Sequence, residues 1–182
     1  NDEPFDELIN VHDLGIENVE GWCFGYRIVE LCTAVKGAAA SYLLEKRGAK
    51  QVFYFDPDMV IFDRFDELSQ LLEQTSILLT PHQSEPETTL DAVMDNEMAS
   101  LKHGVFNLGF VGIQNDEEGQ RFARWWADRL QHFCLDDINR GLFTDQKWAN
   151  LIPCFFDRYR VVRSPAFNVA TWNISTRQVS GT

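Results

Sequence analysis

The sequence predicts an α/β fold in which a mostly parallel sheet is flanked by helices. Apolar runs of strand length at 51–55, 76–80 and 104–113 alternate with segments whose apolar residues recur at helical spacing. Such alternation is typical of strand–helix–strand units with parallel strands. The sequence has 182 residues, of which 45% are hydrophobic, so it is long enough to form one domain with a substantial core.

The order of the elements follows from changes in the period of the apolar pattern. A short strand is expected at 8–11, followed by a helix over 26–47. A helix over 116–134 has an acidic first turn and contains Trp125 and Trp126. Adjacent helix positions face about 100° apart, so one indole is expected in the core and the other partly exposed. Shorter helices are expected at 65–74, 90–101 and 141–151, and a last strand at 160–163.

The composition restricts the classes of partner. The formal net charge is −12, from 28 acidic and 16 basic residues, which argues against nucleic acid or an anionic membrane as the main partner. No apolar run is long enough to span a bilayer, and the acidic start lacks the features of a signal peptide. The four cysteines lack metal-binding spacing and are expected to be buried in a reducing compartment, so we expect a cytoplasmic protein.

The most informative segment is the apolar strand at 51–55, because it ends at Asp56-Pro57-Asp58. Ligands of open α/β sheets bind at the carboxyl ends of the strands. Residues two apart in an extended chain point to the same side, so Asp56 and Asp58 can offer paired oxygen ligands to a hard divalent cation. The alternative is that Asp-Pro-Asp only opens a turn after the strand.

A later strand candidate, at 104–113, contains two residues that an apolar strand does not require. Gly109 is one of them, and a glycine inside a strand often marks a bulge or the close approach of a backbone or ligand. The other is Asn107, whose amide can both donate to and accept from sugar hydroxyls. The alternative is a bulge with a satisfied buried amide.

Asp145 and Gln146 stand near the start of the expected helix at 141–151. An amide beside a carboxylate is suited to orienting a sugar hydroxyl and steadying a developing positive charge. The alternative is that Thr144 or Asp145 only caps the helix.

Lys36 lies within the apolar face of the helix at 26–47, where a solvated lysine is not expected. Its side chain either snorkels to the surface or reaches a phosphate as a point charge. Arg27, near the start of the same helix, presents the same alternatives. His82 follows the strand at 76–80 and either lines the same rim as the carboxylates or is structural.

Taken together, these motifs resemble those of nucleotide-sugar glycosyltransferases of the GT-A fold. The resemblance is strongest to the family 8 type, the group of glycogenin and bacterial lipopolysaccharide galactosyltransferases. It extends over roughly 27–148 and rests on four segments: Thr33-Ala34-Val35-Lys36, Phe53-Tyr54-Phe55-Asp56-Pro57-Asp58, Phe106-Asn107-Leu108-Gly109 and Asp145-Gln146. The resemblance implies a Rossmann-like sheet and a single, partial glycosyltransferase domain over 1–182.

The resemblance also implies roles for the matched residues. Asp56 and Asp58 would bind Mn²⁺ or Mg²⁺ bridging the diphosphate of a nucleotide-sugar, most often a uridine one. The donor sugar and its diphosphate would be held by Asn107, Gly109, Asp145, Gln146, Lys36 and Arg27. The family transfers sugar with retention of configuration, which requires either a carboxylate nucleophile or a front-face transfer. Asp145 is the only nucleophile candidate, and Gln146 would steady a front-face transfer. The glycan, lipid or protein acceptor is not identified, and the polar loop at 81–89 is the candidate segment for it.

Two parts of the family pattern have no counterpart. The first strand and helix, which hold the base and ribose, are missing before Asn1. No histidine-bearing metal motif follows Trp172-Asn173, and no histidine stands where the third metal ligand is expected (His12, His82, His103 and His132). We expect a truncated catalytic domain, the alternative being a diverged relative with a weaker metal site.

Two other classes of protein fit part of the pattern. A haloacid-dehalogenase-like phosphatase would use Asp56 as nucleophile and Asp58 as general acid. Thr80 could supply its hydroxyl, but no apt lysine appears, and its late acidic pair would have to be 136–137, which follows a helix rather than a strand. A catalytically silent domain that binds sugar nucleotides fits the absent first strand and histidine.

Overall fold

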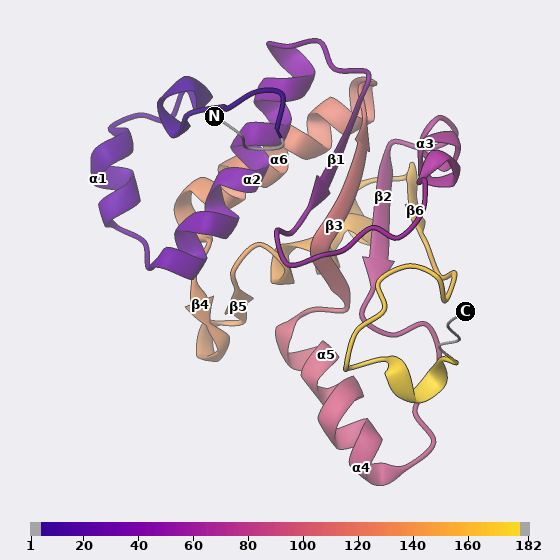
Figure 1. Cartoon of the computed structure of the whole chain (residues 1–182). Helices are drawn as coiled ribbons and strands as arrows, with labels where there is room; N and C mark the ends of the chain where they lie inside the picture. The colour runs from indigo at the N-terminus through magenta and orange to yellow at the C-terminus, as the bar shows by residue number, and fades with distance from the viewer. Residues whose placement is uncertain (1–4, 179–182) are drawn as a thin grey trace.

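The computed structural model describes residues 5–178, and its centre is a four-stranded sheet with helices on both faces (Figure 1). The helices are α1 (Val19–Phe24), α2 (Ile28–Glu45), α3 (Asp66–Leu72), α4 (Leu90–Ala92), α5 (Met98–His103), α6 (Glu117–Phe133) and α7 (Ile152–Phe155). The strands are β1 (Gln51–Phe55), β2 (Ile77–Pro81), β3 (Phe106–Gln114), β4 (Asp136–Asp137), β5 (Leu142–Phe143) and β6 (Tyr159–Val161). A π-helical turn at Val93–Glu97 joins α4 to α5. The chain is therefore of mixed α/β class, as the alternation of patterns predicts.

The four-stranded sheet is mixed, so the prediction of a mostly parallel sheet is wrong. Its strand order is β1-β3-β2-β6; β3 is antiparallel to both β1 and β2, and β2 is parallel to β6. The segment with α4 and α5 extends beyond the end of the sheet instead of crossing its face (Figure 1). The chain therefore returns where β2 ended, and Pro81 pairs with Phe106. An apolar run does not indicate whether a strand is parallel or antiparallel to its neighbours, because buried strands of both orientations have the same apolar pattern.

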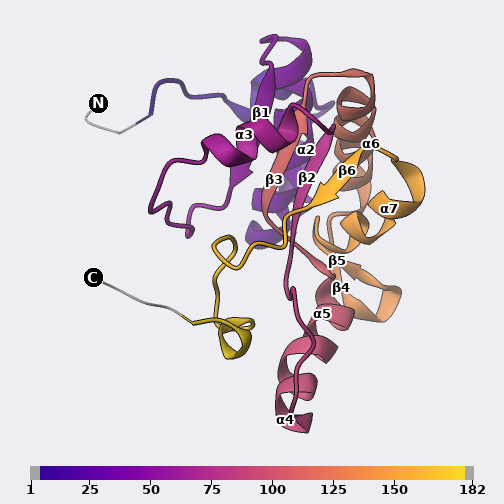
Figure 2. The same ribbon diagram turned by 90° about the vertical axis from the view of Figure 1, so that its right-hand side faces the viewer.

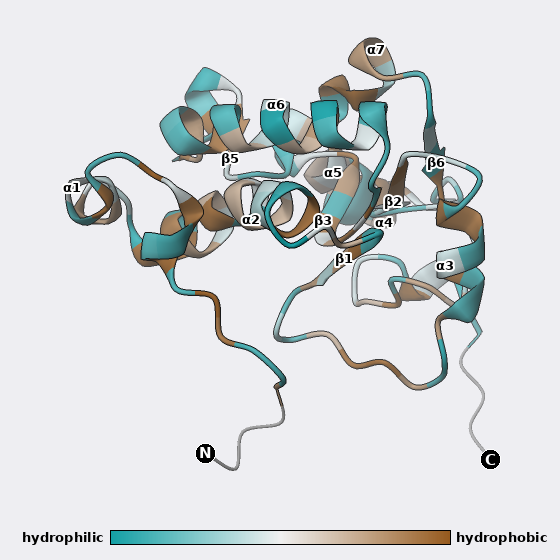
Figure 3. Cartoon of the chain, turned by 90° about the horizontal axis from the view of Figure 1, so that it is seen from above, coloured by the Kyte–Doolittle hydropathy of each residue, from teal (hydrophilic) through white to brown (hydrophobic). Residues whose placement is uncertain are grey.

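The helices form two layers around the sheet. Helices α2 and α6 cover one face and α3 covers the other, as the view from above shows (Figure 3). The larger core cluster lies under α2 and α6 and includes Phe122 and Trp126, whereas the smaller one joins Leu68 and Leu72 of α3 to the sheet. The segment that follows β6 returns on the α3 side of the sheet (Figure 2). This return brings the C-terminal segment to the end of β1.

Close packing between α2 and α6 fixes the position of α2. A Cβ atom on Gly37 would lie 2.6 Å from backbone atoms of Ala127, so only glycine allows this approach. Trp126 is buried, while Trp125 is partly exposed, which confirms the expected division between the two indoles. Because the helices are so close, the neighbouring side chain Lys36 is held beneath the carboxyl end of β1.

Two sequence predictions of secondary structure are wrong. No strand forms at 8–11, because the Asn10 side chain accepts a hydrogen bond from the His12 amide and starts a 3-10 turn. The segment 141–151 is not one helix: β5 pairs with β4, Thr144 adopts a positive φ of 41°, and a 3-10 helix follows at Lys147–Leu151. The other predicted elements are present, with ends shifted by no more than two residues.

The cysteines differ from the expectation of burial. All four are free, but only Cys134 is buried, and Cys32 and Cys154 are exposed. Cys32 lies on the outward side of α2, although it belongs to the apolar pattern of that helix. Within residues 5–178, no helix combines the length and apolar character that crossing a membrane requires.

Candidate active site

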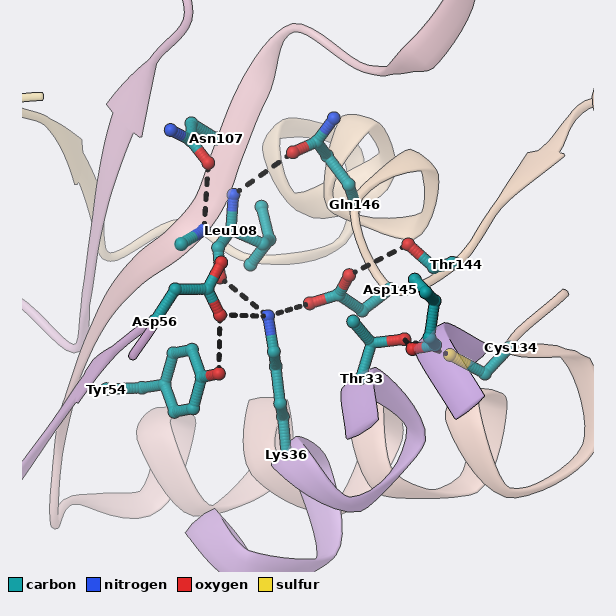
Figure 4. A network of polar contacts seen from close by, with 12 residues as sticks. Thr33, Lys36, Tyr54, Asp56, Asn107, Leu108, Cys134, Thr144, Asp145 and Gln146 are labelled. Atoms are coloured by element: carbon teal, nitrogen blue, oxygen red, sulfur yellow. Dashed lines mark hydrogen bonds and ion pairs between the residues drawn. The ribbon is translucent and has the colours of Figure 1, made fainter. Parts of the chain in front are cut away.

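Lys36 is the centre of a buried ionic cluster that joins α2 to the sheet (Figure 4). Its side chain is 3% exposed, and its Nζ lies 3.1 Å from Asp56 Oδ1 and 3.0 Å from Asp145 Oδ2. The same ammonium donates a hydrogen bond to the Leu108 carbonyl oxygen at 3.1 Å. The snorkelling alternative is therefore wrong. A buried cation requires paired carboxylates, and two distant segments of the chain supply them here.

Tyr54 holds the carboxylate of Asp56 from a second side. Its hydroxyl donates a hydrogen bond of 2.5 Å to Asp56 Oδ1, and its ring centroid lies 4.4 Å from Lys36 Nζ, within cation–π distance. Burial raises the pKa of the Tyr54 phenol, and the bond to Asp56 raises it further, so the hydroxyl remains a donor. Both donors use Oδ1, which leaves Asp56 Oδ2 free for another partner.

Asp145 is the most deeply buried carboxylate of the cluster. Its Oδ1 accepts a hydrogen bond from the Thr144 hydroxyl at 3.1 Å, and its Oδ2 is held by the ion pair with Lys36. Burial raises the pKa of Asp145, and the positive charge of Lys36 opposes that rise. No side chain caps the helix at Lys147–Leu151, so the capping alternative for Thr144 and Asp145 is wrong.

Gln146 ties the start of β3 to α5. Its Oε1 accepts a hydrogen bond from the Leu108 amide at 3.4 Å, and its Nε2 donates to the His103 carbonyl at 3.2 Å. The side chain therefore braces the backbone next to Lys36, since Leu108 also supplies the carbonyl that Lys36 contacts.

Asn107 and Gly109 lie at an irregular point of β3. The pairing with β2 shifts register between Leu79 and Thr80, and Asn107 Oδ1 accepts a hydrogen bond from the Gly109 amide at 2.9 Å. The irregularity and the satisfied amide of that alternative are therefore present, but Asn107 is half-buried rather than buried. Gly109 also lets a side chain come close, because a Cβ there would lie 3.1 Å from Asp56 Oδ2.

Asp56 and Asp58 lie in a turn rather than in an extended chain, because the Met59 amide donates a hydrogen bond to the Asp56 carbonyl at 3.0 Å. The turn that was the alternative interpretation of Asp-Pro-Asp is thus present. Both residues nevertheless line one cavity of about 280 Å³, together with Asn107 and Gly109. Within residues 5–178, no cluster of three or more His, Cys, Asp or Glu side chains has the spacing of a metal site.

The donor set at this cavity fits a hard divalent cation as a partial site. Asp56 Oδ2 makes no hydrogen bond within the cluster, and Asp58 is exposed to solvent beside it. Mg²⁺ in proteins is commonly held by one or two carboxylates, with water and phosphate oxygens completing its shell. Two carboxylates on one rim meet that requirement.

Two other predicted residues lie away from the cluster. Arg27 occupies the N-cap position of α2 and is exposed. It precedes Lys36 by nine residues, or about 13 Å along the helix axis, so it does not reach the carboxylates. His82 instead packs edge-on against Trp172, with ring centroids 5.5 Å apart, and burial lowers its pKa to about 4.

The sequence reasoning missed three residues that shape the site. Tyr54 was read as part of an apolar run, although its spacing of two from Asp56 was an available signal. Asn168 accepts a hydrogen bond of 2.7 Å from Asn107 Nδ2 and, like Trp172, lines the cavity of the carboxylate pair. No local sequence pattern indicates Asn168 or Trp172. They reach the site only because the chain after β6 folds back toward the end of β1.

Comparison with known proteins gives one distant relative. The uncharacterized protein YfnD of Bacillus subtilis (strain 168) is 28% identical over 153 residues, which cover 82% of this chain and 47% of YfnD. The chain thus spans about half the length of that relative. No family model matches the chain, and no solved structure matches it.

Proposed function

We propose that the protein is a metal-dependent glycosyltransferase of the GT-A type, similar to family 8, that takes a sugar from a nucleotide-diphosphate donor. By the same resemblance, the nucleotide is uridine. The observation that best supports this proposal is that all four segments of the resemblance meet at Lys36. Lys36 contacts Asp56, Asp145 and the backbone of Leu108, which lies between Asn107 and Gly109. These segments, spread over more than a hundred residues, thus share one polar centre next to the cavity that Asp56 and Asp58 line.

The carboxylates at the end of β1 would hold Mn²⁺ or Mg²⁺. When bound, such an ion supplies a Lewis acid that stabilises charge on a leaving diphosphate. Tyr54 and Lys36 engage Asp56 Oδ1 and so orient Asp56 Oδ2 toward the cavity. Asp58 stands beside it on the exposed rim. The protein residues thereby prearrange negative oxygen atoms where a cation would bridge to phosphate.

The buried side of the cluster would act on the donor sugar. The positive charge of Lys36 opposes the rise that burial causes in the pKa of Asp145, and Thr144 donates a hydrogen bond that holds the carboxylate. Because both oxygens of Asp145 are already engaged, we favour a role in positioning Lys36 over direct attack on the sugar. This choice supports the front-face route to retention, in which no covalent intermediate with Asp145 forms.

One observation favours the phosphatase alternative, and two oppose it. Lys36 supplies a lysine next to Asp56, which the sequence did not suggest. The Thr80 hydroxyl, however, donates to the Asn107 carbonyl at 3.3 Å instead of facing Asp56. Asp137, one of the late acidic pair, instead caps the 3-10 helix at Ile138–Arg140, where its side chain accepts a hydrogen bond from the Arg140 amide. The chain therefore offers only part of a phosphatase site.

A binding and turnover experiment separates these functions. Melting of the full-length protein is followed with Mn²⁺ and a panel of nucleotide-sugars, and release of free nucleotide is measured in parallel. Stabilisation that needs Mn²⁺ and is lost in Asp58→Asn, but not in the exposed control Asp63→Asn, supports the glycosyltransferase. Hydrolysis of a phosphate monoester with Mg²⁺ identifies a phosphatase instead. Stabilisation without any turnover identifies a silent binding domain.

A further inference from the structure

Asn168 lies on the segment that follows β6, and the mechanism proposed above does not use it. Its side chain lines the same cavity as Asn107 and the carboxylates of Asp56 and Asp58. Four neighbours of Asn168 on this segment line the cavity as well: Ala166, Val169, Ala170 and Trp172. The segment after β6 therefore forms one wall of the cavity, opposite the residues that the strands β1 and β3 supply.

The Asn168 side chain belongs to a chain of three hydrogen bonds that connects β3 to β2. The Gly109 amide donates to Asn107 Oδ1 at 2.9 Å (Figure 4), and Asn107 Nδ2 donates to Asn168 Oδ1 at 2.7 Å. Asn168 Nδ2 in turn donates to the Pro81 carbonyl oxygen at 2.9 Å. Gly109 lies within β3 and Pro81 ends β2, so the two side-chain amides join backbone groups of neighbouring strands.

The backbone groups at the two ends of this chain fix the orientation of both amides. A backbone N–H can only donate, so the oxygen of the Asn107 amide must face Gly109. A carbonyl can only accept, so the nitrogen of the Asn168 amide must face Pro81. Turning either amide over would bring two donors together at one end and two acceptors at the other. Asn168 therefore determines which way the Asn107 amide points.

This orientation leaves Asn107 able to bind a hydroxyl group. An amide oxygen accepts two hydrogen bonds and an amide nitrogen donates two, and within residues 5–178 the Asn107 side chain uses one of each. Gly109 keeps the adjoining space open, because a Cβ there would lie 3.1 Å from Asn107 Oδ1 and 3.1 Å from Asp56 Oδ2. A ligand atom that enters this space comes between the amide and the carboxylate.

The backbone of Asn168 is held without help from its own side chain. Asn173, which is 1% exposed, donates hydrogen bonds of 2.8 Å from Nδ2 to the carbonyl oxygens of Asn168 and His82. The φ of Asn168 is 54°, in the left-handed region that asparagine tolerates and glycine favours. We therefore expect Asn168→Gly to remove the side-chain hydrogen bonds and leave the segment in place.

We infer that Asn168 is a positioning residue for the donor sugar. It orients the Asn107 amide, and Asn107 then holds a hydroxyl group of the sugar. The step from Asn107 to the sugar rests on the proposed function, whereas the orientation of Asn107 by Asn168 does not. Because a nucleotide without a sugar gains nothing from Asn107, the segment after β6 favours binding of the nucleotide-sugar over the free nucleotide.

The first test follows the side-chain amide of Asn107 by NMR in the ¹⁵N-labelled full-length protein, with its signal identified by its absence in Asn107→Ala. In the wild type, the Nδ2 proton bonded to Asn168 should be protected from exchange with water. Asn168→Gly should remove this protection, whereas Asn168→Asp should retain it, because a carboxylate still accepts the bond.

The matched control is Asn18→Gly. Asn18 also has a left-handed backbone, with a φ of 45°, but it is exposed and its side chain makes no capping hydrogen bond. The Asn107 amide should keep its protection in this variant. Protection that persists in Asn168→Gly, or that is lost equally in Asn18→Gly, overturns the orienting role of Asn168.

The second test measures by calorimetry the Kd of UDP-glucose, UDP-galactose and UDP, each with Mn²⁺. Asn168→Gly should raise the Kd of at least one UDP-sugar about threefold to tenfold, as expected for one lost hydrogen bond, and leave that of UDP unchanged. Asn18→Gly should change neither Kd. An equal rise for UDP and the UDP-sugar is what a merely structural role predicts, and that result or the absence of any rise overturns the role in sugar binding.

A double variant tests whether Asn168 acts through Asn107. Adding Asn168→Gly to Asn107→Ala should cause no further rise in the Kd of the UDP-sugar, whereas independent contributions would add. Additive losses therefore overturn the inference. If no UDP-sugar binds to the wild type, the proposed function and the role in sugar binding both fail, while loss of amide protection in Asn168→Gly still supports the orienting role.

Discussion

The buried ion pair between Lys36 and Asp145 makes a quantitative prediction about stability. Lys36→Met retains much of the side-chain volume but removes the cation, and Asp145, whose side chain is 3% exposed, remains behind. Breaking a buried pair in this way costs about 3–5 kcal/mol. Asp56 adds little to the loss, because its side chain is 33% exposed and can regain water. For a protein of this size the melting temperature should fall by about 6–20 °C.

The same reasoning fixes how the loss depends on pH. Burial already raises the pKa of Asp145, and removal of Lys36 raises it further. A carboxyl with a raised pKa in the folded state favours folding below its unfolded pKa, and that contribution is lost as the pH rises through the folded pKa. The loss in the free energy of unfolding of Lys36→Met relative to the wild type should therefore be smallest at about pH 4 and grow toward neutral pH.

Urea unfolding at about pH 4.5 and about pH 7 measures the effect. Adding Asp145→Asn to Lys36→Met should restore much of the stability at neutral pH, since no buried charge is then left unpaired. Lys46→Met, at the exposed C-cap position just after the same helix, should change stability by less than about 0.5 kcal/mol. An equal deficit at both pH values, or a double variant no more stable than Lys36→Met, would refute the reasoning.

Three further predictions concern packing, hydrogen bonding and titration. Gly37→Ala should destabilise the protein by about 1–3 kcal/mol through overpacking against α6, whereas Gly25→Ala, whose Cβ meets only ordinary contacts, should be nearly neutral in urea unfolding. Tyr54→Phe removes one donor from Asp56 and should cost about 1 kcal/mol and weaken Mn²⁺ binding in calorimetry; unchanged Mn²⁺ affinity would contradict the orienting role. The His82 imidazole should titrate at about pH 4 by NMR. Because its pKa is lower in the folded state than in the unfolded state, its contribution to stability is present above the unfolded pKa and is lost as the pH falls through the folded pKa. A midpoint near 6.5 would show that the ring is solvated.

Local sequence signals predicted most elements, because period and capping depend on neighbouring residues. The helix of Lys36, the strand before Asp56 and the helix with Trp126 were all read from apolar spacing. Strand direction was missed, because it depends on where α4 and α5 return the chain. The segment 141–151 was misread, because its apolar residues suit a helix while the pairing of β5 with β4 competes for the same backbone.

The sequence by itself determined which chemistry the chain carries: an Asp-Pro-Asp at the end of an apolar strand, an Asn and a Gly within another, and a lysine in an apolar helix face. Only the tertiary structure decided which of these groups touch. It placed Lys36 between Asp56 and Asp145, added Tyr54 as a donor, and brought Trp172 beside His82. The reason is physical. A residue's type and local period are encoded in adjacent positions, whereas burial of a charge beside its partner depends on contacts between segments that only the packed core brings together.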